Sequence, residues 1–187
     1  MRRLAIALVH FPVLDKESGV VTSAITNLDV HDLARSARTY GVSDYFVVHP
    51  ITAQRDLVLR IQQHWAEGSS GRRIPTRKDA LALVRPVASL DDAYQAMGGR
   101  KAIEVWSTAA KDEGGTLSTD AARTKVEEEG TAVLLLFGTA WGLAPEVHQS
   151  ANARLAPIVS AGDSGYNHLS VRSACAIYLD RLRGARS

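Results

Sequence analysis

The chain has 187 residues, 45% of them hydrophobic and 22% charged, which is the balance of a folded globular protein and not of a disordered one. Its formal net charge of +2 gives no bulk electrostatic reason to expect a polyanionic partner, so such a partner would need a local basic patch. Cys175 is the single cysteine, which excludes an internal disulfide and a thiolate metal cluster and fits a reducing compartment.

The amino terminus superficially resembles a signal peptide, because an apolar run follows Arg2 and Arg3. That run stops at His10, and Pro12 follows without a small-residue cleavage site, so residues 4–10 are better interpreted as a first buried strand. No segment approaches the roughly 20 apolar residues of a membrane helix. We therefore expect a cytoplasmic protein with no membrane partner.

After the first strand and a loop at 11–27, helices and strands alternate. The helix expected at 29–40 has Asp29 as a plausible N-cap and Gly41 as its stop. The other expected strands are 45–49, 81–84, 102–106 and 131–138, and the other expected helices are 51–67, 90–97, 119–129 and 170–183, with Pro145 marking one more helix start. Because hairpin signals are absent, this order predicts an α/β fold with a mostly parallel sheet and helices on both faces, in one domain spanning 1–187.

The segment 68–78 is expected to be flexible. It contains Arg72, Arg73, Arg77 and Lys78 with no acidic residue among them. One interpretation is a solvated mobile loop, and the other is an arm that contacts phosphates, which would make binding salt-dependent.

The last third of the chain holds the expected ligand site. The buried strand 131–138 runs into a turn between Gly138 and Gly142, and a second apolar piece, 155–162, runs into a polar bend at 163–168. Two strand ends, each followed by a loop and a helix, form the place where open α/β sheets bind ligands. The phosphate loop, the G-x-G-x-x-G fingerprint, metal-ligand spacings and the G-x-S-x-G elbow are all absent from the sequence. The two glycines alone could equally serve only to turn the chain tightly.

Four motifs of this chain resemble those of the SPOUT, or α/β-knot, RNA methyltransferases. They are HDLARSARTYGV at 31–42, FGTAWGL at 137–143, API at 156–158 and YNHLSVRSACAIYLDRL at 166–182. Their order and spacing agree with that class over nearly the whole chain. Within it, the sequence is most similar to a bacterial group of trefoil-knot RNA methyltransferases related to the tRNA (guanine-1) methyltransferases.

The resemblance implies a carboxyl-terminal trefoil knot, an exception to the rule that chains do not thread loops. It also implies that S-adenosylmethionine binds in a bent shape among three loops, at 106–109, 136–142 and 158–169, mainly through the main chain. The cofactor-binding residues carried over are Ser107, Thr108, Leu136, Phe137, Gly138, Trp141, Gly142, Ile158, Tyr166, Asn167, His168, Leu169 and Ser170. On this basis we expect Gly138→Val to abolish cofactor binding and to leave the fold largely intact.

The resemblance also suggests catalytic roles, each with a plainer alternative. Arg35 would steer the methyl acceptor, or it could simply pair with Asp32 on a solvated helix face. In ribose-methylating relatives an asparagine stands six residues before this arginine, where Asp29 stands here, which argues against ribose methylation. Asp29, Asp163 and His168 are the candidate proton acceptors.

The plainer alternatives for the last loop are structural. Asp163 would form an Asx turn and His168 a helix-capping hydrogen bond, while Asn167 and Ser170 look like loop-closing and N-cap residues. Arg172 could face the carboxylate of the cofactor or a phosphate.

The function expected is methyl transfer from S-adenosylmethionine to a base nitrogen, in preference to a ribose oxygen, of tRNA or rRNA, without a metal. A homodimer through the first and last helices is implied, with Cys175 as a buried packing residue. One alternative is a catalytically silent module that binds S-adenosylmethionine or RNA. The other is an unknotted Rossmann-type protein that binds a nucleotide.

Overall fold

A computed structural model describes residues 1–111, 116–162 and 165–186. Its main sheet contains strands β1 (Leu4–Val9), β4 (Tyr45–Val48), β5 (Val84–Val87), β6 (Ile103–Ser107), β7 (Thr116–Leu117), β8 (Ala132–Gly138) and β9 (Ala153–Leu155). Their order across the sheet is β5-β4-β1-β8-β6-β9-β7, and every pair is parallel. The predicted mostly parallel sheet is confirmed.

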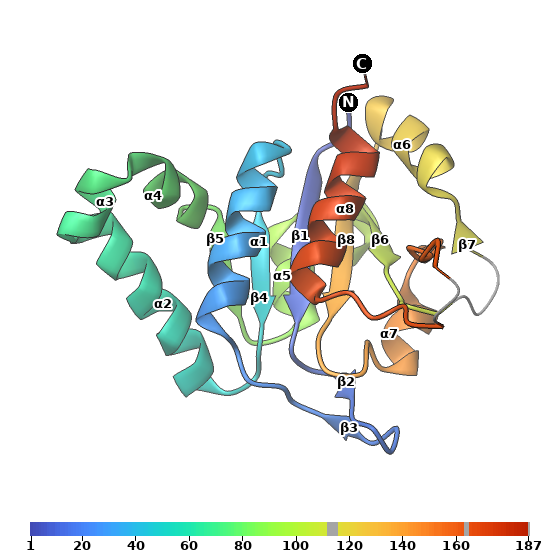
Figure 1. Cartoon of the computed structure of the whole chain (residues 1–187), viewed down its shortest axis with the longest axis horizontal. Coiled ribbons are helices and arrows are strands. Elements are labelled where there is room, and N and C mark those ends of the chain that lie inside the picture. Colours follow the sequence, from blue (N-terminus) through green and yellow to red (C-terminus); the bar gives the residue numbers. More distant parts are fainter. Residues whose placement is uncertain (112–115, 163–164, 187) are drawn as a thin grey trace.

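Helices cover both faces of this sheet (Figure 1). They are α1 (Asn27–Thr39), α2 (Thr52–Glu67), α3 (Ser69–Arg73), α4 (Pro75–Leu81), α5 (Leu90–Ala96), α6 (Thr119–Glu127), α7 (Pro145–Ser150) and α8 (Val171–Arg183), with a 3₁₀ turn at Arg100–Ala102. Helices α1, α6 and α8 lie on one face and α5 and α7 on the other, while α2 to α4 extend beyond the β5 edge. The predicted α/β layering is therefore present.

The two faces are filled by alternate residues of the same strands. In β1, Leu4, Ile6 and Leu8 join the core with α1 and α8, whereas Ala5 and Ala7 join the core with α5 and α7. Side chains alternate across a strand, so a strand that is apolar at every position must be covered on both faces. This requirement places β1 and β8 side by side at the centre of the sheet.

The first helix begins two residues earlier than predicted. Thr26, and not Asp29, is its N-cap: the Thr26 hydroxyl accepts a hydrogen bond from the Asp29 backbone N–H and donates one to the Asp29 carboxylate. Asp29 is the third residue of the helix, where an acidic side chain completes this reciprocal cap. The predicted stop at Gly41 is confirmed, because this residue has a φ of +64° directly after the cap residue Tyr40.

Other boundaries also differ from the predictions. The segment 68–78, predicted to be flexible, consists largely of α3 and α4, because Pro75 starts a helix. The strand predicted at 81–84 lies at Val84–Val87, since β5 is an edge strand where Pro86 is tolerated. In 155–162 only Leu155 belongs to a strand, and a small antiparallel hairpin, β2 (Val13–Leu14) with β3 (Val20–Val21), lies within the predicted first loop.

Candidate functional site

The candidate site lies where the parallel strands end. Strands β1, β4, β6, β8 and β9 all run in the same direction, so the segments that follow them emerge at one edge of the sheet. The three predicted cofactor loops follow β6, β8 and β9 and therefore share this edge. We call this side of the sheet the carboxyl edge.

The turn after β8 folds back tightly onto its own strand. A Cβ atom at Gly138 would lie 2.6 Å from the backbone nitrogen of Leu143 and 2.9 Å from the carbonyl carbon of Gly142. The expectation that Gly138→Val would spare the fold is therefore wrong, because the side chain would meet backbone and not an empty slot. Gly142, with a φ of +108°, faces open space, since a Cβ atom there would have nothing within 4 Å.

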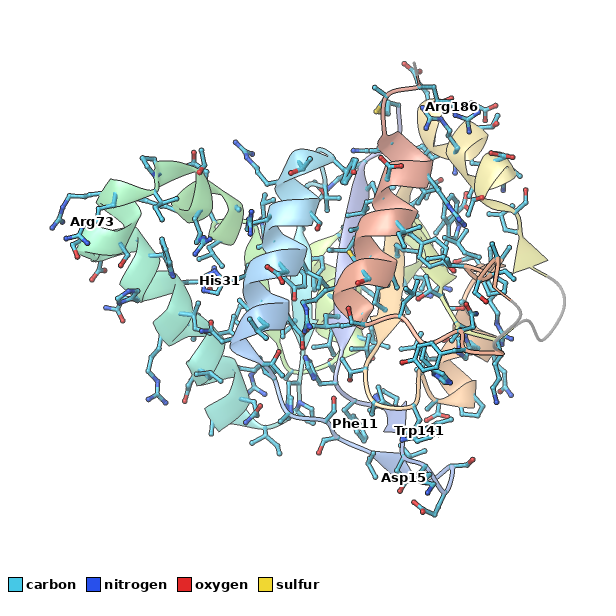
Figure 2. The ribbon with its side chains drawn as sticks, in the orientation of Figure 1. Phe11, Asp15, His31, Arg73, Trp141 and Arg186 are labelled. Atoms are coloured by element: carbon cyan, nitrogen blue, oxygen red, sulfur yellow. The ribbon has the colours of Figure 1, made fainter. Side chains whose placement is uncertain are left out.

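The amino-terminal hairpin holds the outer side of this turn. The backbone N–H of Leu14 donates to the Gly142 carbonyl at 2.9 Å, and the Trp141 N–H donates to the Leu14 carbonyl at 3.0 Å. Trp141 itself is 62% exposed. Figure 2 shows Phe11, Asp15 and Trp141 together at this end of the molecule. The hairpin thus fixes the backbone of the turn and leaves the indole able to meet a ligand.

The loop after β6 is anchored to β8. The Thr108 hydroxyl donates to the Leu136 carbonyl at 2.9 Å, and the Thr108 N–H reaches the same oxygen at 3.2 Å. The Ser107 hydroxyl lies 2.9 Å from Nδ1 of His148 on α7. The side chains of Leu136 and Phe137 are buried in the two cores, so only their main chain is available to a ligand.

Asn167 closes the loop after β9, as predicted. Its Oδ1 accepts from the Ser160 N–H at 3.0 Å, and its Nδ2 donates to the carbonyls of Ile158 at 2.9 Å and Ala110 at 3.4 Å. One amide side chain therefore joins two turns of its own loop to the loop after β6. The third predicted cofactor loop is thus fixed to the segment after β6 by hydrogen bonds between one side chain and main-chain groups.

The end of this loop presents exposed rings beside α8. The rings of Tyr166 and His168 lie 5.4 Å apart, and both residues are exposed. Ser170 is the N-cap of α8, as predicted, because its hydroxyl accepts from the Ser173 N–H at 3.2 Å. Leu169 is 47% exposed. The predicted capping role of His168 has no support in these contacts, and Asp163 lies outside the described residues.

Asp29, one of the two predicted catalytic residues on α1, forms an ion pair with Arg172 of α8. Arg172 Nη1 donates to Asp29 Oδ1 at 2.7 Å, and its Nε lies 3.6 Å from Asp32 Oδ2. The side chain of Asp29 is only 7% exposed. Arg35 is more than half exposed and lies 3.9 Å from Asp32, so the predicted i, i+3 pair is present but long. The guanidinium of Arg172 faces these carboxylates, and Arg35 remains open to a partner.

A partly buried network that we did not predict lies beneath the turn after β8; we call it the histidine–hydroxyl network (His10, Ser23, His49 and Thr139). The Thr139 hydroxyl donates to the Val9 carbonyl at 3.0 Å, so the Ser23 hydroxyl must donate to Thr139. The His10 Nδ1, 2.9 Å from Ser23, is then the donor to its hydroxyl. This assignment leaves His10 Nε2 unprotonated, and that atom is buried without a partner among the described residues.

The network joins the first strand, the hairpin arm and the turn after β8. His49 Nε2 lies 3.0 Å from the Ser23 carbonyl, and the rings of His10 and His49 are 5.7 Å apart. Burial, reinforced by His49, lowers the pKa of His10 to about 4, so the ring is neutral at pH 7. Each histidine directly follows a buried strand in the sequence, and this is the signal that could have placed both at the carboxyl edge.

The three loops fit an adenosyl ligand. Their exposed large apolar side chains are Trp141, Val159, Tyr166 and Leu169. Gly142 and Gly165 both have positive φ values, and a Cβ at either would meet nothing within 4 Å. Apolar side chains combined with glycine backbone that a ligand can approach closely suit a purine nucleoside.

No group of three or more histidine, cysteine, aspartate or glutamate side chains suited to a metal occurs within 1–111, 116–162 and 165–186. Over the same residues, no helix is long and apolar enough to cross a membrane. Cys175 is fully buried in the core between α8 and the sheet, as predicted, and burial raises the pKa of its thiol.

Comparisons with known proteins agree with this geometry. A family described as SAM-dependent RNA methyltransferase matches residues 3–184. A tRNA (guanine-N(1)-)-methyltransferase of Oleidesulfovibrio alaskensis is 42% identical over 98% of this chain, but the chain spans only 42% of that protein. An uncharacterized protein of Aquifex aeolicus is 36% identical over 95% of this chain and 86% of its own length.

The fold also matches solved structures. A probable methyltransferase from Bordetella pertussis superposes with a TM-score of 0.64 and 16% sequence identity, covering 97% of this chain and 95% of the other. Identity at this level shows a shared fold and nothing about the substrate.

Proposed function

The chain belongs to the SAM-dependent RNA methyltransferase family, and from that premise we propose that it transfers a methyl group from S-adenosylmethionine to a base nitrogen of tRNA or rRNA within a single domain. The relative from Oleidesulfovibrio alaskensis is named for guanine N1 of tRNA, which favours that position among base nitrogens. Asp29 stands where ribose-methylating relatives carry an asparagine, which favours a base over a ribose oxygen.

The observation that carries this proposal is the closure of the loops at the carboxyl edge. Asn167 ties the loop after β9 to the loop after β6, and Thr108 ties the latter to β8. The loops at this edge carry the glycine turns at Gly142 and Gly165 and the exposed apolar side chains of Trp141 and Tyr166. The residues proposed to hold the donor are those of the three loops, with Trp141 and Tyr166 as the apolar walls and Gly142 as the point of close approach.

The sulfonium of bound S-adenosylmethionine supplies an activated methyl group. The protein must then orient the acceptor and remove its proton. Arg35 is open enough to contact a phosphate or the acceptor base. Among the described candidates, His168 is the proton acceptor we favour, because it is exposed at the loop end whereas Asp29 is held by Arg172 and Thr26. Asp163 remains a candidate.

We further propose that the tail of the chain is threaded as a trefoil knot. Strand β9 lies between β6 and β7 in the sheet, although it follows both of them in the sequence. Helix α8, which follows β9 in the sequence, packs against α1 and α6. A strand inserted late in the sequence between two earlier strands, followed by a helix packed on the same sheet, supports the proposal of a threaded tail.

A homodimer through α1 and α8 is the proposed assembly. These helices lie side by side on one face of the sheet (Figure 1), and Ala174, Ala176 and Ile177 of α8 remain partly exposed. Sedimentation at several protein concentrations would test this assembly, and a monomer at all of them would contradict it.

The test of the activity uses labelled S-adenosylmethionine, total bacterial RNA and nucleoside mass spectrometry. We expect label in a methylated base, and His168→Ala should lower the turnover at saturating S-adenosylmethionine, because the variant lacks the proposed proton acceptor. Label found only in a ribose would overturn the base assignment, and unchanged turnover in His168→Ala would move the proton acceptor elsewhere.

A further inference from the structure

A cavity of about 650 Å³ lies between α1, α2 and α4, apart from the three loops. Its volume falls in the roughly 300–1,000 Å³ range of ligand pockets. The lining includes His31, Arg60, His64, Trp65 and Arg77. In Figure 2, His31 lies between α1 and α2, on the flank of α1 that faces away from α8.

The aromatic wall of this cavity is a stacked assembly centred on Trp65. The Arg77 guanidinium carbon lies 5.0 Å from the centroid of the Trp65 ring. The His31 ring meets the indole edge-on, with centroids 5.5 Å apart. His31 Nδ1 is buried with no hydrogen-bond partner among the described residues. Planar rings and guanidinium groups with an unused polar atom are the elements that bind unstacked nucleobases.

The charge of the surrounding helices favours a polyanion. Between Thr52 and Leu81 there are six arginine and lysine residues against three acidic ones, in a chain whose whole formal charge is only +2. Arg60, Arg72 and Arg73 are all exposed, and Arg77 is half-buried against Trp65. The segment from α2 to α4 therefore carries three more basic than acidic residues, and two of its arginines, Arg60 and Arg77, line the cavity itself.

The frame is fixed and adjoins the candidate site. Gln62 Nε2 donates to the carbonyls of Leu81 at 3.0 Å and Val84 at 2.8 Å, which ties α2 to the end of α4 and to the sheet. Asp32 lines the cavity and also lies near Arg172 and Arg35 in the ion pairs between α1 and α8. A ligand in the cavity would thus lie on the same stretch of α1 as the proposed acceptor-steering arginine.

We propose that this cavity binds an unstacked base of the RNA substrate, at a nucleotide other than the one that is methylated. The Trp65–Arg77 pair provides the stacking surface, and Arg60 contacts a flanking phosphate. This inference rests on the proposed RNA substrate and adds to it a second recognition point, which selects single-stranded or looped RNA over duplex. Within the basic segment 68–78, Arg77 of α4 is the residue that lines this cavity.

The test is fluorescence anisotropy of the full chain with a short labelled single-stranded RNA of mixed sequence, with duplex RNA as competitor. Trp65→Ala should weaken binding roughly tenfold, the loss typical of one stacked base, whereas Trp65→Phe keeps a stacking ring and should retain most of the affinity. Arg60→Ala should lower the slope of log affinity against log salt by about 0.7, the value for one phosphate of a single strand. Lys101→Ala, a change in an exposed lysine far from this cavity and just before β6, should alter neither quantity.

Calorimetry with S-adenosylhomocysteine, a stable analogue of the donor, on the same preparations separates folding from recognition, because the proposed donor loops lie apart from the cavity. Donor-site affinity should be unchanged in Trp65→Ala. The proposal would be overturned if Trp65→Ala bound RNA as tightly as the wild type. It would also be overturned if Trp65→Ala changed the mass measured by sedimentation and left RNA binding unaltered, because the cavity would then be a protein interface. If RNA binds through Trp65 but receives no methyl group, the proposed function fails and the pocket stands.

Discussion

Arg172 at the start of α8 donates to Asp29 in the first turn of α1 at 2.7 Å, and this contact joins the last helix of the chain to the first. The second oxygen of Asp29 accepts from the Thr26 hydroxyl at 2.7 Å. The loop that ends at Ser170 is thereby held against the first motif at 31–42. Because both oxygens of the Asp29 carboxylate accept hydrogen bonds, this residue holds α1 and α8 in position. For the same reason it is poorly placed to take a proton from a substrate.

Arg172→Ala should lower the free energy of unfolding by about 2 kcal/mol, because it leaves the nearly buried Asp29 carboxylate without its charged partner. Urea denaturation measures this change. The control is Arg186→Ala, which removes an ion pair whose side chains are 64% and 87% exposed and should shift stability by less than about 0.5 kcal/mol. Equal effects of the two substitutions would refute the positioning role of the pair.

Asn167→Ala should weaken S-adenosylmethionine binding roughly tenfold or more, because three hydrogen bonds that shape the loop after β9 are lost. Isothermal titration calorimetry measures the affinity. The matched control is Ser160→Ala, since Ser160 contributes its backbone N–H to Asn167 and that group survives the substitution. An Asn167→Ala protein that binds the donor as tightly as the control would remove this loop from the site.

Gly138→Ala should cost about 1–3 kcal/mol of stability, because its Cβ would meet the backbone at Gly142 and Leu143 in a packed turn. Thermal or urea unfolding measures the loss. Gly162→Ala is the control, since a Cβ there meets nothing within 4 Å and Gly162 has no positive φ. Unfolding midpoints that match for the two variants would show that the turn after β8 can relax freely.

The histidine–hydroxyl network predicts a pH dependence of stability. The folded-state pKa of His10 is about 4, below its ordinary value of 6.5, because burial disfavours the charged ring. As the pH falls below 6.5 the unfolded chain takes up this proton first, so His10 lowers stability progressively down to about pH 4, by a total on the order of 3 kcal/mol. Above pH 6.5 its contribution is constant.

The measurement is the free energy of unfolding between pH 4 and 7 for the wild type and His10→Asn, whose amide can still donate to Ser23. We expect a shallower pH slope in the variant. His64→Asn, a change at an exposed histidine of α2, should leave the wild-type slope in place. Parallel curves for wild type and His10→Asn would mean that His10 titrates alike in the folded and unfolded states.

Patterns within single elements predicted much of the fold. Apolar runs in the sequence predicted β1, β4 and β8, and helical spacing of apolar residues predicted α1, α2 and α8. Each of these patterns can be recognised without knowing what the element packs against. The predictions failed where tertiary context decides: Pro86 is allowed because β5 is an edge strand, and the basic segment 68–78 becomes helical where it packs against α2. A capping hydroxyl at Thr26 also outweighed the acidic residue that follows it.

The candidate site was visible in part. The loop-closing role of Asn167 and the N-cap role of Ser170 were predicted correctly. An amide in a polar bend and a serine before an apolar helix commonly take these structural roles. The pairing of Arg172 with Asp29 could not be predicted, since 143 positions separate the two residues. The Trp65 cavity was missed for the same reason: its walls come from α1, α2 and α4, and only the folded chain brings them together.

The central claim is that the loops at the carboxyl edge bind S-adenosylmethionine for methyl transfer to RNA. The most direct test measures the transfer of labelled methyl groups from S-adenosylmethionine into bacterial tRNA and rRNA by the wild type and by Asn167→Ala. We predict label in a methylated base with the wild type and a large loss of label with Asn167→Ala. Absence of label from every RNA, or equal labelling by the two proteins, would contradict the account.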